Sequence, residues 1–207
     1  MASGHVLKKF QSHYHALDSH VQEWDTMHES LVRLMGTFAN MCERFPGLTE
    51  TVNYGTLCPE VEGIVAKVVG SQADRLAGVY KEMQRSVLDL EDVCQRMRAV
   101  YTRALGFVRQ EARVLMVQRR NTKTSPVPPV HECLDGIDRI VTMFERETRV
   151  CRLLVWRMDG MSENVGGIHV FRSWIQSSHL IDREEVVKRI YVIKASIEDD
   201  TMNNKRL

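Results

Sequence analysis

The sequence lacks the residue patterns of the common metal and nucleotide sites. None of its five cysteines forms a Cys-x-x-Cys pair, and none of its eight histidines belongs to a His-Glu-x-x-His motif or follows a glutamate at a distance of three. Structural zinc, metalloprotease zinc and di-iron bundles use those spacings. The Gly166-Gly167 pair precedes no Gly-Lys-Ser/Thr and does not indicate a phosphate-binding loop. We therefore predict no cofactor and no metal site.

The sequence also lacks a convincing catalytic set. Asp18, Ser19 and His20 carry the right groups for nucleophilic catalysis, but they are consecutive. Consecutive residues of a helix point in different directions, so these three do not form a triad. The sequence predicts no catalytic residue and no enzyme.

Net charge and long apolar runs are missing as well. Lysine and arginine number 28 against 27 acidic residues, a formal net charge of +1, so no global field draws the chain to DNA, RNA or anionic lipid. No stretch approaches the roughly 20 apolar residues that span a bilayer. Residues 1–10 lack the apolar core of a secretory signal, and the cysteines fit reduced, buried thiols. These features favour the nucleus and cytoplasm.

What the sequence does have is a long apolar seam. Apolar residues recur at alternating spacings of three and four, a period that keeps one side of a helix against partner helices. His28 interrupts the seam, and a polar residue there is typical of one that sets register. His13 and His15 flank the seam and are expected to face solvent. The seam consists of Leu7, Phe10, Tyr14, Leu17, Val21, Trp24, Leu31, Met35, Phe38, Cys42 and Phe45.

Two more long helices are expected after the first. The first helix should end at Phe45, because Pro46 disfavours helical geometry in the residue before it. The second should begin at Pro59, since proline suits a first helical position. Its apolar face is broad enough to touch two or more neighbours, as in a bundle. The third should cover residues 129–158.

A shorter helix is expected near the C-terminus. Asp182 and Glu185 have the spacing of an N-cap residue and a reciprocal carboxylate. A buried side would be formed by Val186, Val187, Ile190, Ile193 and Ile197.

The fold class that follows is all-α, an elongated antiparallel helical bundle with three long helices and a shorter C-terminal helix. The chain has 207 residues, of which 43% are hydrophobic and 27% charged, which suits one folded domain. We predict that residues 1–198 form this domain, with a loop at 121–130 between its halves and a polar tail at 199–207.

Two groups of surface residues are candidates for partner binding. Glu145, Arg149, Arg152 and Trp156 recur at helical spacing off the seam, and tryptophan and arginine are favoured anchors of protein interfaces. The alternative is a solvated face, with a Glu145–Arg149 pair and with Trp156 covered by the last helix. The second group is a candidate docking edge, with a lid over the bundle end as the favoured alternative, and consists of Phe171, Trp174 and Ile175.

The order of several features along the chain resembles the AIRIM family, ribosome maturation factors that associate with AAA ATPases. The likeness spans nearly the whole chain, and the segment around Trp174 is also similar to the cyclin-dependent-kinase-interacting protein. The residues that carry the likeness are Leu7-Lys8-Lys9-Phe10, Trp24, Phe45-Pro46-Gly47-Leu48, Arg75-Leu76-Ala77, Ile137-Asp138-Arg139, Trp174 and Asp182-Arg183-Glu184.

This resemblance implies a non-catalytic adaptor subunit of an AAA-ATPase complex that acts in large ribosomal subunit maturation and chromatin-linked proteostasis. The implied partners are ATPase subunits, a second small helical subunit of the cyclin-dependent-kinase-interacting type and a pre-ribosomal client, with no direct nucleic-acid or membrane contact. Two alternatives are a self-associating coiled-coil scaffold, which would use the long seam between chains, and a metal or cofactor enzyme hidden in the bundle.

Overall fold

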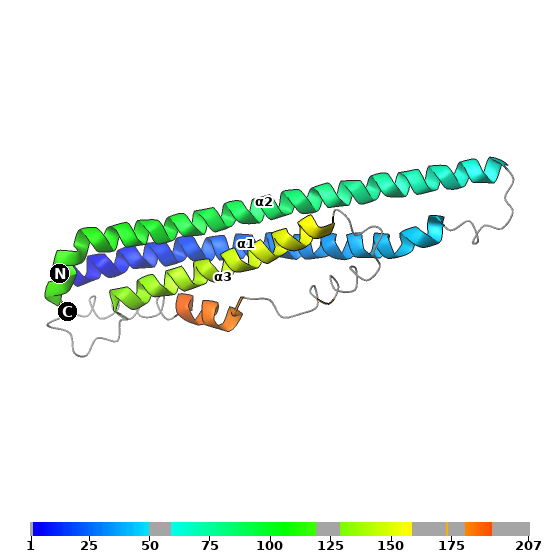
Figure 1. Cartoon of the computed structure of the whole chain (residues 1–207). Coiled ribbons are helices and arrows are strands. Elements are labelled where there is room, and N and C mark those ends of the chain that lie inside the picture. The colour runs from blue at the N-terminus through cyan, green and yellow to red at the C-terminus, as the bar shows by residue number, and fades with distance from the viewer. Residues whose placement is uncertain (1, 50–58, 119–128, 159–172, 174–180, 192–207) are drawn as a thin grey trace. The chain divides into compact units, whose positions relative to one another are not determined.

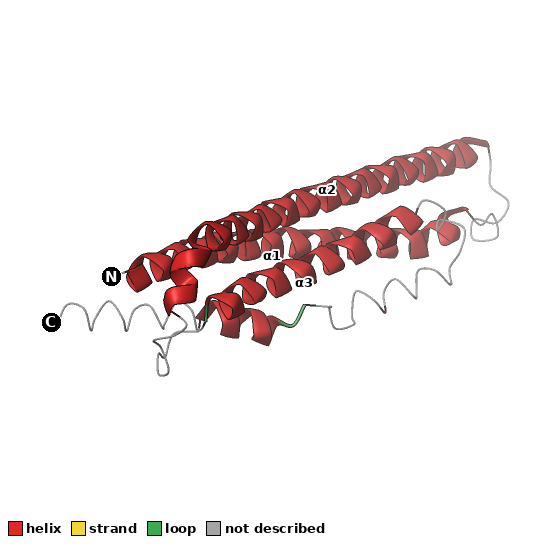
Figure 2. Ribbon diagram, turned by 60° about the vertical axis from the view of Figure 1, so that its left-hand side comes forward, coloured by secondary structure: helices red, strands yellow, loops and turns green. Residues whose placement is uncertain are grey.

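The computed structural model of the protein describes residues 2–49, 59–118, 129–158, 173 and 181–191 (Figure 1). These residues form three long helices, α1 (Ala2–Thr49), α2 (Pro59–Gln118) and α3 (Val130–Arg157), and a short helix at residues 183–191. Figure 2 shows this part of the chain without a strand. Among the described helices, none combines the length and the apolar character needed to cross a lipid bilayer. The predicted all-α fold, with three long helices and a shorter C-terminal helix, is confirmed.

α2 and α3 begin close to the predicted positions. α2 starts at Pro59, as expected for a residue whose missing N–H has no helical partner at that position. α3 starts at Val130, and the Cys133 amide donates to the Pro129 carbonyl at 3.1 Å. The prolines therefore mark both helix starts correctly.

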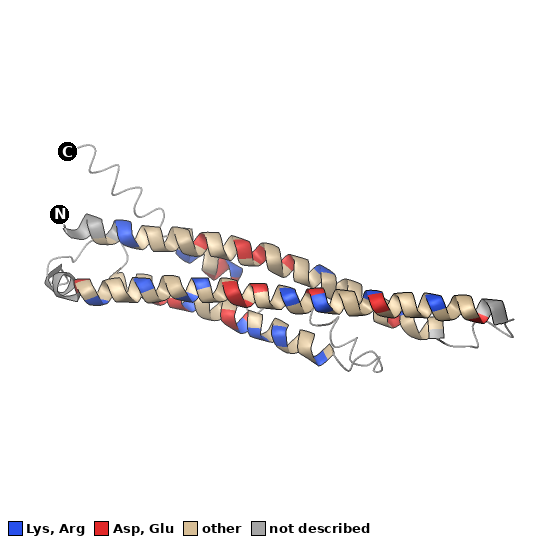
Figure 3. Ribbon diagram, turned by 90° about the horizontal axis from the view of Figure 1, so that it is seen from above, with Lys and Arg blue, Asp and Glu red and all other residues tan. Residues whose placement is uncertain are grey.

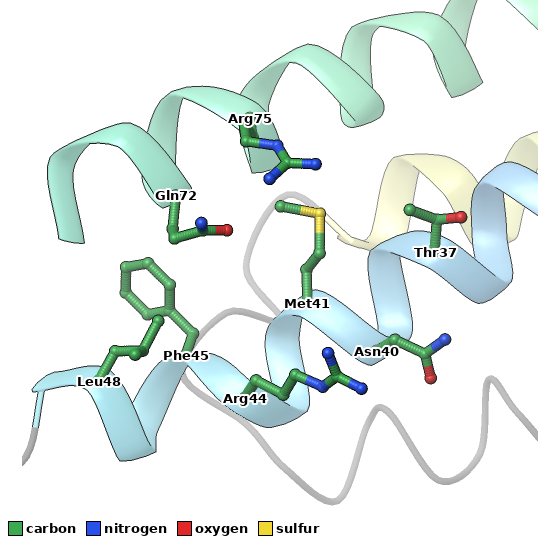
Figure 4. Close-up of a pocket in the computed structure, with 8 residues that line it drawn as sticks. All are labelled: Thr37, Asn40, Met41, Arg44, Phe45, Leu48, Gln72 and Arg75. Atoms are coloured by element: carbon green, nitrogen blue, oxygen red, sulfur yellow. The ribbon is translucent and has the colours of Figure 1, made fainter. Parts of the chain in front are cut away.

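α1 does not end at Phe45, so that prediction is wrong. The helix continues through Pro46 to Thr49. A proline inside a helix loses one backbone hydrogen bond and crowds the preceding turn, at a cost of about 3 kcal/mol. Phe45 and Leu48 are half-buried and lie opposite Gln72 of α2 (Figure 4).

The chain divides into two compact units, and each long helix contributes to both. The first unit contains Met1–Asp25, Glu91–Glu147 and His179–Leu207. The second contains Thr26–Leu90 and Thr148–Ser178. Each unit therefore has its own set of packed helix segments and its own core.

In the first unit, α1 and α2 run antiparallel. Phe10, near the start of α1, packs edge-on against Phe107 of α2, with 6.1 Å between the ring centroids. Glu23, further along α1, accepts two 2.8 Å hydrogen bonds from the guanidinium of Arg96. Residue numbers rise along α1 as they fall along α2, which establishes the antiparallel direction.

α3 runs parallel to α1 in the first unit, and buried aromatic residues hold the two together. The Tyr14 hydroxyl donates to the Cys133 carbonyl at 2.7 Å. The Trp24 ring packs edge-on against Phe144 at a centroid distance of 4.9 Å. Tyr14, Trp24 and Phe144 are fully buried, and Tyr14 and Trp24 belong to the predicted seam.

The short helix has the N-cap that the sequence predicts. Asp182 Oδ1 accepts a 2.9 Å hydrogen bond from the Glu185 amide, and the Asp182 carbonyl accepts from Val186 N at 3.0 Å. This bond satisfies a helix-end donor. The Glu185 carboxylate accepts from Arg189 Nε at 2.5 Å, one turn further along the helix. The Glu185 carboxylate, which was expected to reach back to Asp182, therefore forms an i,i+4 ion pair with Arg189.

The buried side of the short helix is narrower than predicted. Val186 and Ile190 are buried, but Val187 is 65% exposed, so its assignment to the core is wrong. Adjacent residues of a helix point about 100° apart, and one neighbouring surface does not cover both Val186 and Val187. Ile193 and Ile197 lie outside the described residues. Arg183 links the short helix to α1 through an ion pair with Asp25 and a cation–π contact in which its guanidinium carbon lies 5.8 Å from the centroid of the Trp24 ring.

In the second unit, burial is uneven along α2. Phe38 of α1 packs against Tyr80 of α2 at 6.1 Å, and residue order again makes these helices antiparallel. None of the described side chains at residues 62–82 of α2 is buried, and apolar residues such as Leu76 are only half-buried. The core of this unit consists of Leu31, Met35, Phe38, Ala39, Cys42, Met83, Val87, Leu90, Cys151, Val155 and Met158.

Candidate protein-interaction surface

The structure separates the predicted partner-binding residues. Glu145 belongs to the first unit, whereas Arg149, Arg152 and Trp156 belong to the second. The predicted residues outside the described part of the chain are Phe171, Trp174 and Ile175.

Glu145 is engaged within the first unit by an arginine that the sequence analysis did not single out. Its carboxylate accepts hydrogen bonds of 2.8 and 2.6 Å from Arg98 of α2, and Arg98 also donates to Asp138 at 2.6 Å. The hydrogen bond from Arg98 to Glu145 raises the pKa of the guanidinium above its ordinary value, with a smaller contribution from Asp138. Bidentate geometry of this kind holds α2 and α3 in register. Glu145 therefore has an internal partner.

The last two turns of α3 present a continuous exposed face in the second unit. Trp156 is 46% exposed and Leu153 is 54% exposed. Arg149, Arg152 and Arg157 are exposed beside them. We call these five residues the α3 face. Their spacing of three and four places them along one side of the helix.

The α3 face combines positive charge with apolar area. Between Thr148 and Met158 the sequence has three arginines and no acidic residue, and Figure 3 shows this end of α3 marked by basic residues. Trp156 and Leu153 supply large apolar surface next to guanidinium groups, a combination enriched at interface hot spots. Leu153 is not among the residues that the sequence analysis predicts for partner binding. Its spacing from Arg149 and Trp156 is the signal that identifies it.

His13 is buried, so the prediction that it faces solvent is wrong, whereas His15 is exposed as predicted. The His13 ring packs edge-on against Phe10 at 6.2 Å. Burial lowers the pKa of His13 below its ordinary 6.5, and the positive charges of Lys9 and Arg103 lower it further. α1 contacts several helices in this unit, so the buried stripe is wider than the seam.

The lowered pKa of His13 couples folding to pH. The folded protein favours the neutral ring, so the unfolded chain binds more protons once the pH falls below about 6.5. The stability that comes from neutral His13 is present above that pH and is lost as the pH falls toward the folded-state pKa.

The second unit holds two metal-binding atom types close together. His28 and Cys151 are both buried, and a ring nitrogen and the thiol sulfur lie within 4.8 Å of each other. The burial of His28 agrees with its predicted place on the seam. The absence of a bound metal stays a prediction, which metal analysis of the purified protein tests.

The described part of the chain defines an all-α protein whose exposed features are helix faces. Residues 4–195 match the family of ribosome biogenesis proteins described as C1orf109-like. The chain belongs to this family, which is the AIRIM family that its sequence resembles. No curated protein matches the chain.

Proposed function

We propose that this protein is a non-catalytic adaptor subunit of an AAA-ATPase complex that acts in large ribosomal subunit maturation and chromatin-linked protein turnover. Membership of a ribosome biogenesis family supports the first of these processes. The AIRIM likeness points to the ATPase and to a second small helical subunit as partners in the nucleus and cytoplasm. The ATPase performs the chemistry, and this chain contributes binding surface.

The α3 face is the observation that carries this proposal. An exposed tryptophan and leucine beside three arginines fit a partner surface that offers apolar pockets rimmed by carboxylates. Burial of Trp156 and Leu153 would supply affinity, while the arginines would orient the partner. The face contains no nucleophile, base or metal ligand, which suits docking.

Affinity purification of the tagged full-length chain tests the proposal. The wild-type chain should recover AAA-ATPase subunits, identified by mass spectrometry. Arg149→Glu combined with Trp156→Ala should reduce that recovery about tenfold or more, because it removes an apolar anchor and reverses a charge. Helix content measured by circular dichroism should stay unchanged, since both side chains are exposed.

A matched control makes the result specific. Arg139→Glu combined with Tyr191→Ala also reverses one exposed charge and removes one exposed aromatic ring, but both positions lie in the first unit. This variant should recover the ATPase at the wild-type level. Equal recovery by both variants would reject the α3 face, and no ATPase with the wild-type chain would reject the adaptor role.

Burial of the α1 seam favours an adaptor over the self-associating scaffold. Seam residues such as Phe10, Trp24 and Leu31 are already covered by other segments of the same chain. Between Phe10 and Cys42 the seam is buried in this way and has little apolar surface left for a second copy. We therefore expect the purified chain to have the mass of a monomer in solution, and a stable oligomer formed through α1 would favour the scaffold.

A further inference from the structure

The second unit contains a groove between the end of α1 and the start of α2. It has a volume of about 430 Å³. Figure 4 shows Met41 and Phe45 of α1 facing Gln72 and Arg75 of α2. Met41, Phe45 and the neighbouring Leu48 are half-buried, so the floor of the groove is apolar and only partly covered.

The groove is lined by positive charge without a compensating acid. Arg44 and Arg75 are both exposed, and no lining residue carries a carboxylate. Within the described part of the chain, neither guanidinium takes part in an ion pair. The remaining lining residues are neutral, with Thr37 and Asn40 on the α1 side. Two arginines over an apolar floor favour an occupant that has carboxylates beside apolar side chains.

The apolar surface continues along α2 beyond the groove. A second hollow of about 260 Å³ shares Gln72 with the first and is bordered by Ile64, Val68 and Lys67. Ile64 is 61% exposed and Val68 is 44% exposed. Residues 62–82 correspond to about 30 Å of helix, and none of their described side chains is buried. This length suits a helical occupant better than a small molecule.

We propose that the groove and the adjoining stripe of Ile64 and Val68 form a docking site for an amphipathic helix of another protein that carries acidic residues along its apolar edge. Apolar side chains of that helix occupy the space over Met41 and Phe45. Its carboxylates pair with Arg44 and Arg75. The site is distinct from the α3 face and does not depend on the proposed ATPase partner.

Site-specific photocrosslinking in cells tests this docking site on the full-length chain. A benzophenone amino acid replaces Val68, and the crosslinked peptide is sequenced by mass spectrometry. The expected product is a segment of another protein with apolar residues at helical spacing and flanking aspartate or glutamate. The same amino acid in place of Leu88, which is 55% exposed on α2 and does not line the groove, should not give this product.

Charge reversal tests the role of the arginines. Arg44→Glu with Arg75→Glu should lower the yield of the Val68 crosslink about tenfold. Lys81→Glu with Arg85→Glu changes the net charge equally at exposed positions outside the groove and should leave the yield unchanged. The crosslinked segment, synthesised as a labelled peptide, should bind the purified wild-type chain. A version with lysine in place of its acidic residues should prefer the Arg44→Glu, Arg75→Glu protein.

Several results would overturn the proposal. Crosslinks to a second copy of this chain or to another segment of the same chain would show a different occupant. A partner segment without acidic residues, no crosslink at Val68, or equal yields from the two charge-reversal variants would reject charge-directed docking. Loss of ATPase recovery in the α3-face variant would leave this test unaffected, so the two proposals fail separately.

Discussion

Gly136→Ala is expected to destabilise the first unit, although alanine is the better helix former. A Cβ atom at Gly136 would lie 2.5 Å from the Tyr14 hydroxyl oxygen and 3.4 Å from the Arg189 guanidinium. Real Cβ atoms essentially never approach an oxygen so closely, so Tyr14 or α3 must move. Tyr14 is fully buried and donates a 2.7 Å hydrogen bond to Cys133, which restricts that movement.

The expected magnitude follows from three terms. Overpacking of a buried site costs about 1–3 kcal/mol. Displacement of the Tyr14 hydroxyl leaves buried polar groups without their bond, which costs about 1–3 kcal/mol more. The higher helix propensity of alanine returns about 1 kcal/mol. We therefore expect the free energy of unfolding to fall by about 1–5 kcal/mol, measured by urea unfolding with circular dichroism.

Two comparisons make this prediction sharp. Gly106→Ala lies in the same unit on α2, where an added Cβ meets no atom within 4 Å, and it should stabilise the protein by up to about 1 kcal/mol. Tyr14→Phe removes the hydroxyl in conflict, so combining it with Gly136→Ala should cost less than the sum of the single changes. Equal effects of the two glycine substitutions, or strict additivity with Tyr14→Phe, would refute the close packing of α3 on Tyr14.

Three further substitutions test other parts of the core. Leu31→Asp buries an unpaired charge in the second unit and should lower the free energy of unfolding by about 3 kcal/mol or more. Leu88→Asp, at an exposed side chain, should change the free energy of unfolding by about 0.5 kcal/mol or less. Urea unfolding measures both variants, and similar losses would contradict the burial of Leu31. Asp182→Ala removes the N-cap of the short helix and should cost about 1 kcal/mol in the same assay, whereas no change would mean that the cap does not form in solution. His13→Leu should flatten the loss of stability as the pH falls below 6.5, and an unchanged slope would count against a buried His13.

The periodicity of the sequence predicted the helices well because burial repeats at the spacing of a helix. Trp24, Leu31 and Met35 are fully buried at seam positions, and the starts at Pro59 and Val130 follow from proline chemistry. These features depend on local sequence, which the one-dimensional pattern contains.

The errors arose where a neighbouring helix decides the outcome. α1 continues through Pro46, where its last turn borders a groove against α2, and His13 is buried because α1 has several neighbours in the first unit. The Arg98–Glu145 pair joins residues 47 positions apart, and no local pattern indicates it. Glu145 was consequently expected on the surface face together with Arg149.

Residues 62–82 of α2 show what a periodic apolar face specifies. The spacing that buries Met83, Val87 and Leu90 within the second unit continues toward Ile64, yet burial stops at Met83. Hydrophobic periodicity establishes that a helix needs a neighbour, but the neighbour can come from the same chain or from another protein. In the first unit, α1, α3 and the short helix contribute side chains to one core, so the requirement is met internally. Along the start of α2 the apolar stripe of Ile64 and Val68 remains exposed, and within the described residues Arg44 and Arg75 have no ion pair. A partner that supplies both apolar and acidic side chains meets the same physical requirement.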